Sequence, residues 1–322
     1  MSTATALIPV RLARRNVEAD GIASFELVSA DGRDLPAFTA GSHIDVVLGE
    51  GLIRQYSLCN PPSGSGSYLL GVLLDPASRG GSRAMHALKE GDVIQVSAPR
   101  NHFGLAPGAR RSLLLAGGIG VTPILCMAEQ LATEGADFEM HYCARSISRT
   151  AFVSRIREAA FARRAHLHFD DGDASQAFAM DALLAQPQPG THLYVCGPRG
   201  FMDAVLDCAR RHGWPETQIH YEFFAGAAVA TEGDAGFTVK LARSGTLVPV
   251  ASGQTIAQAL TAAGVPLAMS CEQGVCGTCM TRVLDGTPDH RDMFMTPDEQ
   301  ARNDQITPCC SRSKSPLLVL DL

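Results

Sequence analysis

The stretch Cys271-Glu-Gln-Gly-Val-Cys276-Gly-Thr-Cys279 spaces its cysteines as C-x4-C-x2-C, and two adjacent cysteines, Cys309 and Cys310, follow nearer the C-terminus. This spacing is typical of plant-type [2Fe-2S] clusters, in which four thiolates converge on two bridged irons. The first three thiolates of the predicted cluster are therefore Cys271, Cys276 and Cys279, with a fourth from the later pair.

Two glycines within the stretch, Gly274 and Gly277, let the backbone approach and turn where a Cβ would collide. The alternative is a structural zinc site, but such sites usually pair two short spacings and fit this pattern poorly. Successive side chains of an extended segment point to opposite faces, so only one of Cys309 and Cys310 can face the cluster. Spacing alone leaves open which of them does.

The other five cysteines lie singly, mostly within apolar stretches, as small buried hydrophobes do in a reducing compartment. They are Cys59, Cys126, Cys143, Cys196 and Cys208.

The chain of 322 residues suits two or three domains, and its 46% hydrophobic content is that of a globular protein. A net charge of −6 argues against nucleic-acid binding. No apolar run is long enough for a membrane helix. The few apolar residues before Arg11 precede the charges, unlike the order in a signal peptide. We therefore expect a cytoplasmic protein without a membrane partner.

Residues 1–106 predict a small antiparallel barrel, because short strands are separated by turns and accompanied by one helix. The strands are expected within 17–29 and at 43–48, 54–58, 68–74 and 93–97, and the helix at 82–88.

Residues 107–226 predict a parallel sheet with helices on both faces, because strands and helices alternate. The strands are expected at 112–116, 138–144, 166–169 and 192–196, and the helices at 123–135, 151–165 and 200–213. Residues 227–235 are expected to be a linker. Residues 236–322, with strands at 237–242 and 246–250 and a helix at 255–263, predict an α+β domain that carries the cysteine stretch.

The strand motif Arg54-Gln-Tyr56-Ser57 offers what a flavin needs: a guanidinium for phosphate, an aromatic face and a hydroxyl near the ring. Taken alone the motif is weak, because an exposed Arg and a half-buried Tyr are common on barrel strands. Gly80-Gly81-Ser82 opens a predicted helix, where free N–H groups bind anions. The alternative there is a plain turn capped by Ser82. The two motifs in one domain favour flavin binding.

A glycine turn with Gly117, Gly118 and Gly120 joins a strand to a helix that starts near Thr122. It does not have the G-x-G-x-x-G spacing, but such a turn still lets a pyrophosphate or ribose approach. Cys196-Gly197-Pro198 ends another strand before a helix. Both turns follow strand C-termini, where such sheets bind ligands. Each turn is equally compatible with a purely structural role.

The order of these motifs resembles the phthalate dioxygenase reductase family over essentially the whole chain. Members of that family run from an FMN-binding barrel, through an NAD-binding domain, to a plant-type ferredoxin domain. The matching stretches are Arg54-Gln-Tyr-Ser57, Ser78–Ser82, Pro99–Phe103, Ala116–Pro123, Tyr194–Pro198, the cysteine stretch and Cys309-Cys-Ser-Arg312.

The resemblance implies that Cys309 is the fourth cluster ligand and that Glu222-Phe-Phe224 lies near the flavin. It also implies that Arg145, Ser146 and Asp171 lie near the nucleotide. Ser57, beside the flavin ring, and Cys196, beside the nicotinamide, are then candidates for catalytic tuning, with simple packing as the alternative. One departure concerns the FMN phosphate: Leu73 and Leu74 stand where relatives often carry basic residues.

By this resemblance we expect a monomeric reductase. It would pass electrons from NADH through FMN and the [2Fe-2S] cluster to a separate Rieske-type terminal oxygenase acting on an aromatic compound. FAD stays open as the flavin, and Arg145 and Arg149 keep NADPH open as the nucleotide. The alternatives are a non-enzymatic redox sensor or ferredoxin-like carrier, which needs no nucleotide domain, and a self-contained hydroxylase, which needs a further domain.

Overall fold

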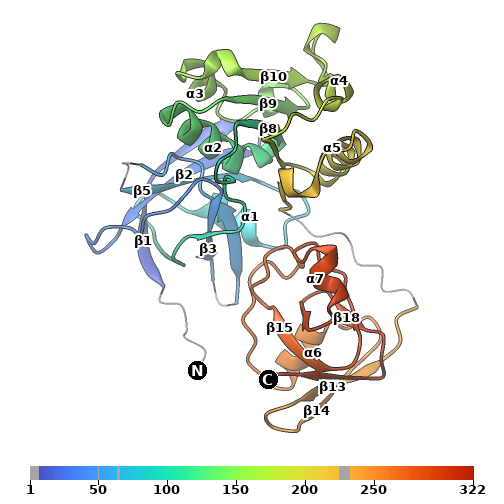
Figure 1. Cartoon of the computed structure of the whole chain (residues 1–322). Helices are drawn as coiled ribbons and strands as arrows, with labels where there is room; N and C mark the ends of the chain where they lie inside the picture. Colours follow the sequence, from blue (N-terminus) through green and yellow to red (C-terminus); the bar gives the residue numbers. More distant parts are fainter. Residues whose placement is uncertain (1–6, 50, 64–65, 225–232) are drawn as a thin grey trace. The chain divides into compact units, whose positions relative to one another are not determined.

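The computed structural model describes residues 7–49, 51–63, 66–224 and 233–322. The chain divides after Phe224 into two compact units (Figure 1). Most of the expected linker at 227–235 lies outside the described residues, and the boundaries expected at 106, 226 and 235 stay predictions. Among the described helices, none has the length and apolar character needed to span a bilayer.

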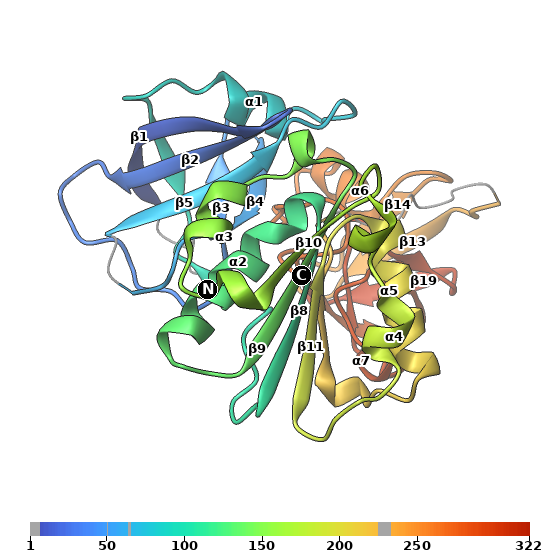
Figure 2. The same ribbon diagram turned by 90° about the horizontal axis from the view of Figure 1, so that it is seen from above.

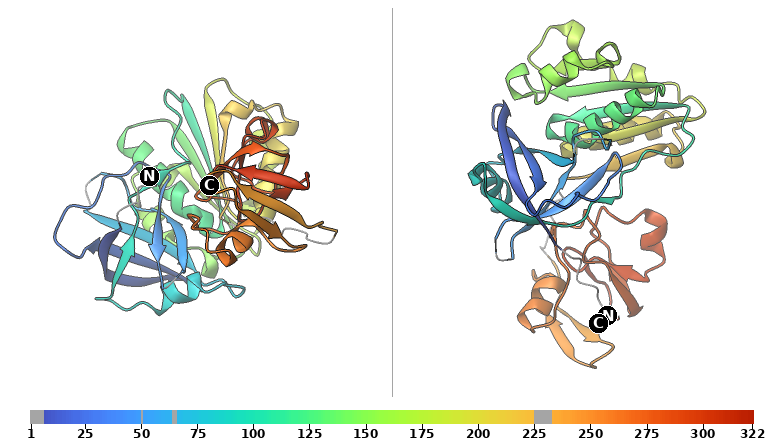
Figure 3. Two further views of the ribbon diagram at one scale, coloured as in Figure 1. Left: turned by 90° about the horizontal axis from the view of Figure 1, so that it is seen from below. Right: turned by 90° about the vertical axis from the view of Figure 1, so that its left-hand side faces the viewer.

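The first unit begins with an antiparallel sheet ordered β4-β3-β6-β1-β2-β5, with β7 paired to β3. A bridge between Leu58, which follows β4, and Leu70 of β5 links the two edges of this sheet. Figure 3 shows its blue strands inclined to one another rather than flat. The small antiparallel barrel expected for this region is confirmed, in the form of a half-barrel. Its elements are β1 (Ile8–Ala19), β2 (Ile22–Ser29), β3 (Ser42–Val47), β4 (Ile53–Ser57), β5 (Ser67–Leu73), α1 (Gly81–Ala87), β6 (Val93–Val96) and β7 (Arg100–Asn101).

The strand β1 was not expected from the sequence, which indicated one strand within 17–29. The structure has two strands joined at Asp20 and Gly21, with Gly21 at a φ of 72°. Val10 and Leu12 of β1 are fully buried while Arg11 between them is exposed. The period of two is therefore present, but the cluster of arginines conceals it.

The second half of this unit is a parallel sheet ordered β10-β9-β8-β11-β12. Helices α2 and α3 lie on one face, and α4 and α5 on the other (Figures 1 and 2). Because every strand is parallel, all five carboxyl ends meet at one edge. The elements are β8 (Arg111–Gly117), α2 (Val121–Thr133), β9 (Phe138–Ala144), α3 (Val153–Glu158), β10 (Ala165–Phe169), α4 (Met180–Leu184), β11 (Thr191–Cys196), α5 (Arg199–Arg211) and β12 (Ile219–Glu222).

This architecture confirms the expected α/β class, with three local differences. The helix expected at 151–165 is shorter, because α3 ends at Glu158 and a single 3₁₀ turn, Ala162–Arg164, follows. The short elements α4 and β12 were not expected, since neither is long enough to show a clear period.

The half-barrel and the parallel sheet share one hydrophobic core, in which Ile22 and Cys59 of the barrel pack with Ile124 of α2. Hydrogen bonds reinforce it: the Cys126 thiol donates to the Asn60 carbonyl (3.1 Å), and Arg155 Nη2 donates to the Cys59 carbonyl (3.0 Å). The barrel face and the sheet edge are therefore held in a defined relation.

The second unit is α+β, as expected, with a mixed sheet ordered β14-β13-β19-β15-β17. Helix α6 begins with a reciprocal cap, in which Thr255 and Gln258 each accept a backbone N–H from the other. The cysteine stretch follows α6 as a loop. The elements are β13 (Phe237–Leu241), β14 (Leu247–Val250), α6 (Ile256–Ala262), β15 (Thr281–Asp285), β16 (Pro288–Asp289), α7 (Pro297–Ala301), β17 (Gln305–Ile306), β18 (Arg312–Ser313) and β19 (Leu317–Leu320).

Candidate functional site

Four thiols converge inside the second unit. The Cys271 thiol contacts those of Cys276 and Cys309, and the Cys309 thiol also contacts that of Cys279. All four residues are buried. Three of them come from the loop after α6 and the fourth from the loop between β17 and β18, so the fold brings together two segments far apart in sequence.

The charge state of these thiols follows from their contacts. Hydrogen bonds from Cys276 and Cys309, followed by a backbone N–H of Gln273 at 3.3 Å, hold the pKa of Cys271 well below its ordinary value. The same thiol contacts raise the pKa of Cys276 and of Cys309. A buried group of four thiols with a stabilised thiolate is the donor set that an iron–sulfur cluster requires.

The two glycines of the loop are required by its geometry. Gly274 has a φ of 71°, and an added Cβ would lie 2.4 Å from the Cys310 sulfur. Gly277 has a φ of 68°, and its Cβ would lie 2.5 Å from the Phe294 ring. Both conformation and space therefore exclude a side chain at either position.

Cys310 lies differently from Cys309. Its sulfur is 3.4 Å from the Thr307 hydroxyl and 3.8 Å from the Ser311 hydroxyl. Cys310 thus contacts Cys309 and polar groups of its own loop, whereas Cys309 also makes the contacts with Cys271 and Cys279. The geometry favours Cys309 as the fourth ligand.

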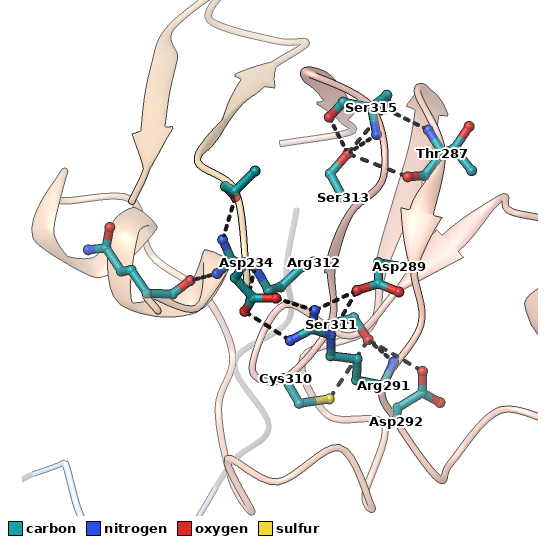
Figure 4. Close-up of polar contacts among 12 residues, drawn as sticks. Asp234, Thr287, Asp289, Arg291, Asp292, Cys310, Ser311, Arg312, Ser313 and Ser315 are labelled. Carbon is teal, nitrogen blue, oxygen red and sulfur yellow. Dashed lines mark hydrogen bonds and ion pairs between the residues drawn. The ribbon is translucent and has the colours of Figure 1, made fainter. Parts of the chain in front are cut away.

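An ion-pair network anchors the segment that carries Cys309 (Figure 4). The Asp234 carboxylate pairs with Arg291 Nη2 at 2.6 Å and with Arg312 Nε at 3.1 Å. Arg312 also donates to the carbonyls of Ala235 and Ala251. Asp234, which fell in the expected linker, is thus an anchor of the second unit, and no sequence pattern signalled that role.

In the first unit, a serine, a glutamate and a histidine meet where β4 and β12 end. The Ser57 hydroxyl donates to Glu222 Oε2 at 3.2 Å, and His43 Nδ1 lies 3.7 Å from Glu222 Oε1. Neither ring nitrogen of the buried His43 has a hydrogen-bond partner among the described residues. A polar ligand or an ordered water molecule would satisfy such a group.

Burial sets the protonation of this site. It raises the pKa of Glu222 to about 7, an effect that the hydrogen bond from Ser57 partly offsets. It lowers the pKa of His43 to about 4, helped by the charges of Arg100 and His102. Burial, and then the charge of Glu222, also raise the pKa of Cys196 well above its ordinary value. Near pH 7 His43 and Cys196 are therefore uncharged, while Glu222 exchanges a proton.

The sequence made Ser57 and Cys196 candidates and, through the resemblance, placed Glu222 near the flavin without a role; it did not indicate His43. The sequence could have identified Glu222 as a site residue, because it is acidic and stands just before two phenylalanines near the end of the nucleotide region. His43 carried no such signal, because a histidine within a strand is ordinarily a packed side chain.

The two sequence motifs of the barrel meet in space. Arg54 Nη2 donates to the Arg79 carbonyl at 3.3 Å, and a Cβ on Gly81 would lie 2.5 Å from Arg54 Cγ. Gly80 has a φ of 99° and caps α1 without a side-chain hydrogen bond. The Ser82 hydroxyl instead accepts the Asp75 N–H at 3.1 Å, so the expected cap by Ser82 is wrong.

The two glycine turns of the parallel sheet also pack against each other. A Cβ on Gly120 would lie 2.3 Å from the Cys196 carbonyl oxygen, and one on Gly197 would lie 3.0 Å from Gly117 Cα. These glycines are therefore needed for packing whether or not a ligand binds. Thr122 is buried, and its hydroxyl donates to the Ile119 carbonyl at 3.1 Å.

The remaining candidates lie at the same sheet edge. Arg145 and Ser146 follow β9, and Asp171 follows β10, with its N–H donating to the Arg145 carbonyl at 3.3 Å. Gly118, at a φ of 51°, follows β8, and Pro198 caps α5 after β11. Phe224, just beyond β12, has 37% of its surface exposed. The residues proposed from the sequence to bind the nucleotide therefore lie together at the carboxyl edge of the parallel sheet.

Comparisons with known proteins match every part of this architecture. Residues 239–314 match the family described as 2Fe-2S iron-sulfur cluster binding domain, and residues 94–219 match dimethylamine monooxygenase subunit DmmA-like, N-terminal domain. A vanillate O-demethylase oxidoreductase from Pseudomonas putida is 57% identical over 98% of this chain and 100% of its own length. A phthalate dioxygenase reductase from Burkholderia cepacia is 38% identical over 97% of each chain.

The solved structure of a phthalate dioxygenase reductase, described as modular for electron transfer from pyridine nucleotides to [2Fe-2S], is similarly close. Its TM-score is 0.76 at 38% identity, and the match covers 98% of both chains.

Proposed function

The chain belongs to the phthalate dioxygenase reductase family, and we propose that it is the reductase of a vanillate O-demethylase. Like its relatives it is an oxidoreductase that passes electrons from NADH through a flavin and a [2Fe-2S] cluster to a terminal oxygenase component. The vanillate assignment is supported by sequence identity. The chain is 57% identical to the vanillate O-demethylase oxidoreductase but 38% identical to the phthalate dioxygenase reductase, in both cases over nearly its whole length.

For the cluster, the proposed ligands are Cys271, Cys276, Cys279 and Cys309. Their support is the buried convergence of the four thiols, in which Cys309 contacts Cys271 and Cys279, whereas Cys310 contacts Cys309 and Thr307. When bound, the cluster takes up and releases one electron at a time.

For the flavin, the proposed site is the face between β4 and the start of α1. Arg54, held along Gly81, supplies a guanidinium, and Gly80 opens a helix whose first N–H groups have no side-chain cap. A single anion site of this kind suits the single phosphate of FMN. Position 73 is a leucine and so adds no positive charge for a further phosphate. FMN is therefore the proposed flavin, with Tyr56 and Ser57 of β4 and Phe224 beyond β12 as the residues proposed to contact its ring.

For NADH, the proposed site is the strand-end edge formed by Gly117, Gly118, Gly120, Thr122, Arg145, Ser146, Asp171, Cys196, Gly197 and Pro198. A bound flavin supplies the conversion of a two-electron hydride into single electrons. The protein's own residues orient the reactants and manage a proton. Ser57 donates to Glu222, whose pKa near 7 suits it to hold and return a proton.

The experiment that tests this function has two stages. Anaerobic NADH should bleach both flavin and cluster absorption of the purified protein, and mass spectrometry of the released flavin should identify FMN. The protein should then support vanillate-dependent NADH consumption and formaldehyde release when mixed with a vanillate oxygenase component. A phthalate oxygenase component is the matched control. Equal or better coupling to the phthalate component would contradict the vanillate proposal but leave the family assignment standing.

A further inference from the structure

Three potential metal ligands converge on one face of the parallel sheet, away from the redox edge. Glu139 and His141 are alternate residues of β9 and share a face, and His166 of β10 pairs directly with His141. One ligand atom from each lies within 4.8 Å of the others. Glu139 Oε1 is 3.2 Å from Nε2 of both histidines.

Hydrogen bonds determine which nitrogen of His141 carries its proton. His168 Nδ1 lies 3.0 Å from the Gln176 carbonyl, which only accepts, so this nitrogen is the donor. In the neutral ring that carries its proton on Nδ1, His168 Nε2 has a lone pair. His141 Nδ1, 3.0 Å away, must then donate to it. The lone pair of His141 is therefore on Nε2.

This tautomer aims a lone pair at a carboxylate. His141 has only 8% of its surface exposed, and its buried Nε2 faces the Glu139 carboxylate. Two acceptors, His141 Nε2 and Glu139 Oε1, thus face each other at 3.2 Å. Such a pair repels unless a cation lies between the two atoms.

We propose that Glu139, His141 and His166 bind a zinc ion. Two imidazoles and one carboxylate, with a fourth position for water, form a recognised zinc donor set. The hydrogen bond from His141 Nδ1 to His168, itself anchored on the Gln176 carbonyl, is the kind of outer partner that orients a metal-bound histidine.

The surroundings of the proposed zinc site suit a Glu139 carboxylate that binds through one oxygen and a fourth ligand position that is open to water. Arg111 Nη2 binds Glu139 Oε2 at 2.5 Å, which leaves Oε1 for the metal. Asp137, 4.0 Å from Arg111 Nε, offsets part of the arginine charge. The His166 side chain is 46% exposed, so an ion and a water molecule have access from solvent.

The site's position assigns it a structural role. Glu139 and His166 are each the second residue of their strands, whereas the nucleotide candidates follow the strand ends. A zinc ion there joins the edge strand β10 to β9. Zinc should therefore raise the unfolding temperature of the protein and leave the rate of flavin reduction by NADH unchanged.

A second group, Asp181, Cys208 and His212, also places ligand atoms within 4.8 Å of one another. Its carboxylate is 70% exposed and already pairs with His212 at 3.0 Å. It differs from the first group in having a sulfur, and this difference allows the two sites to be told apart.

The test is a calorimetric titration of the chelator-treated holoprotein with Zn²⁺ alone. One ion per chain is expected, with affinity at least about ten-fold weaker in His166→Ala and in Glu139→Gln. The matched control is His192→Ala, which removes a histidine that stacks on His220 in the same sheet but belongs to neither group. Flavin content and circular dichroism check that each variant is folded, and His166→Ala, at a half-exposed position, is the safer of the two.

X-ray absorption at the zinc edge identifies the ligands. Nitrogen and oxygen ligands at about 2.0–2.1 Å without sulfur are expected, whereas sulfur at about 2.3 Å would place the ion at Cys208 or in the cysteine loop. Sulfur ligation overturns the proposal, as does equal binding by wild type and both variants. If wild type does not bind Zn²⁺ saturably, a proton fills the gap between His141 and Glu139 and the proposal also fails.

Discussion

The Ser57 hydroxyl donates a hydrogen bond to the Glu222 carboxylate, 3.2 Å away, across 165 positions of sequence. Ser57 ends β4 of the half-barrel and Glu222 ends β12 of the parallel sheet. The pair forms because the two parts share one core, to which the bond from Arg155 to the Cys59 carbonyl contributes. The relation between barrel and sheet thus sets the protonation of the proposed flavin site.

Ser57→Ala should slow flavin reduction by NADH at least about ten-fold, because a hydrogen bond to a carboxylate is worth about 1.5–3 kcal/mol. Stopped-flow absorbance under anaerobic conditions measures this rate. Ser24→Ala is the matched control, since buried Ser24 also donates to a glutamate, Glu18, at 2.6 Å. Equal slowing in both variants would show that the effect of Ser57 is general destabilisation.

Glu222→Gln should become more stable than wild type as the pH rises from 5 to 8. The folded pKa of Glu222 is about 7 against an ordinary 4.5, so the folded state binds more protons between these values. The contribution of Glu222 to the free energy of unfolding is therefore fully present below pH 4.5. It is lost as the pH rises through 7, and the loss is about 3 kcal/mol at most. Gln does not titrate and avoids this loss.

Differential scanning calorimetry of the two holoproteins measures the Glu222 effect. The unfolding temperature of the variant minus that of wild type should be near zero at pH 4.5 and several degrees at pH 8. A difference that does not change with pH would contradict the raised pKa.

Gly81→Ala should weaken flavin binding at least about ten-fold, because the new Cβ would lie 2.5 Å from Arg54 Cγ and displace that side chain. Fluorescence titration of the deflavinated protein with FMN measures the dissociation constant. In Gly200→Ala the new Cβ meets no atom within 4 Å, and alanine suits the helix α5, so this control should keep wild-type affinity. Unchanged affinity in Gly81→Ala would remove Arg54 from the flavin site.

Cys309→Ser should lose the cluster, and Cys310→Ser should keep it. Cys309 contacts Cys271 and Cys279, whereas a serine hydroxyl at 310 can keep the bond with Thr307. Iron and sulfide analysis, with electron paramagnetic resonance of the reduced protein, measures cluster content. The reverse pattern would make Cys310 the ligand.

Local pattern predicted the long and regular elements well. The bounds of β9 were predicted to the residue, and the start of α5 to within one, because apolar and polar residues alternate at the start of β9 and a clear helical period spans α5. The missed elements were those whose pattern is short or masked by charge: β12 has four residues, and β1 alternates its buried residues with arginines.

The cysteine spacing determined the kind of metal centre from sequence alone, because four thiolates and two glycines restrict a short loop to few chemistries. The order of the motifs likewise indicated three kinds of domain. Only the tertiary structure decided which side chains meet. It set Cys309 apart from Cys310. It also paired Ser57 with Glu222 and placed His166 of β10 beside Glu139 of β9. The physical reason is that these contacts join residues on different strands or loops, and their burial and proton positions arise only when the strands pack.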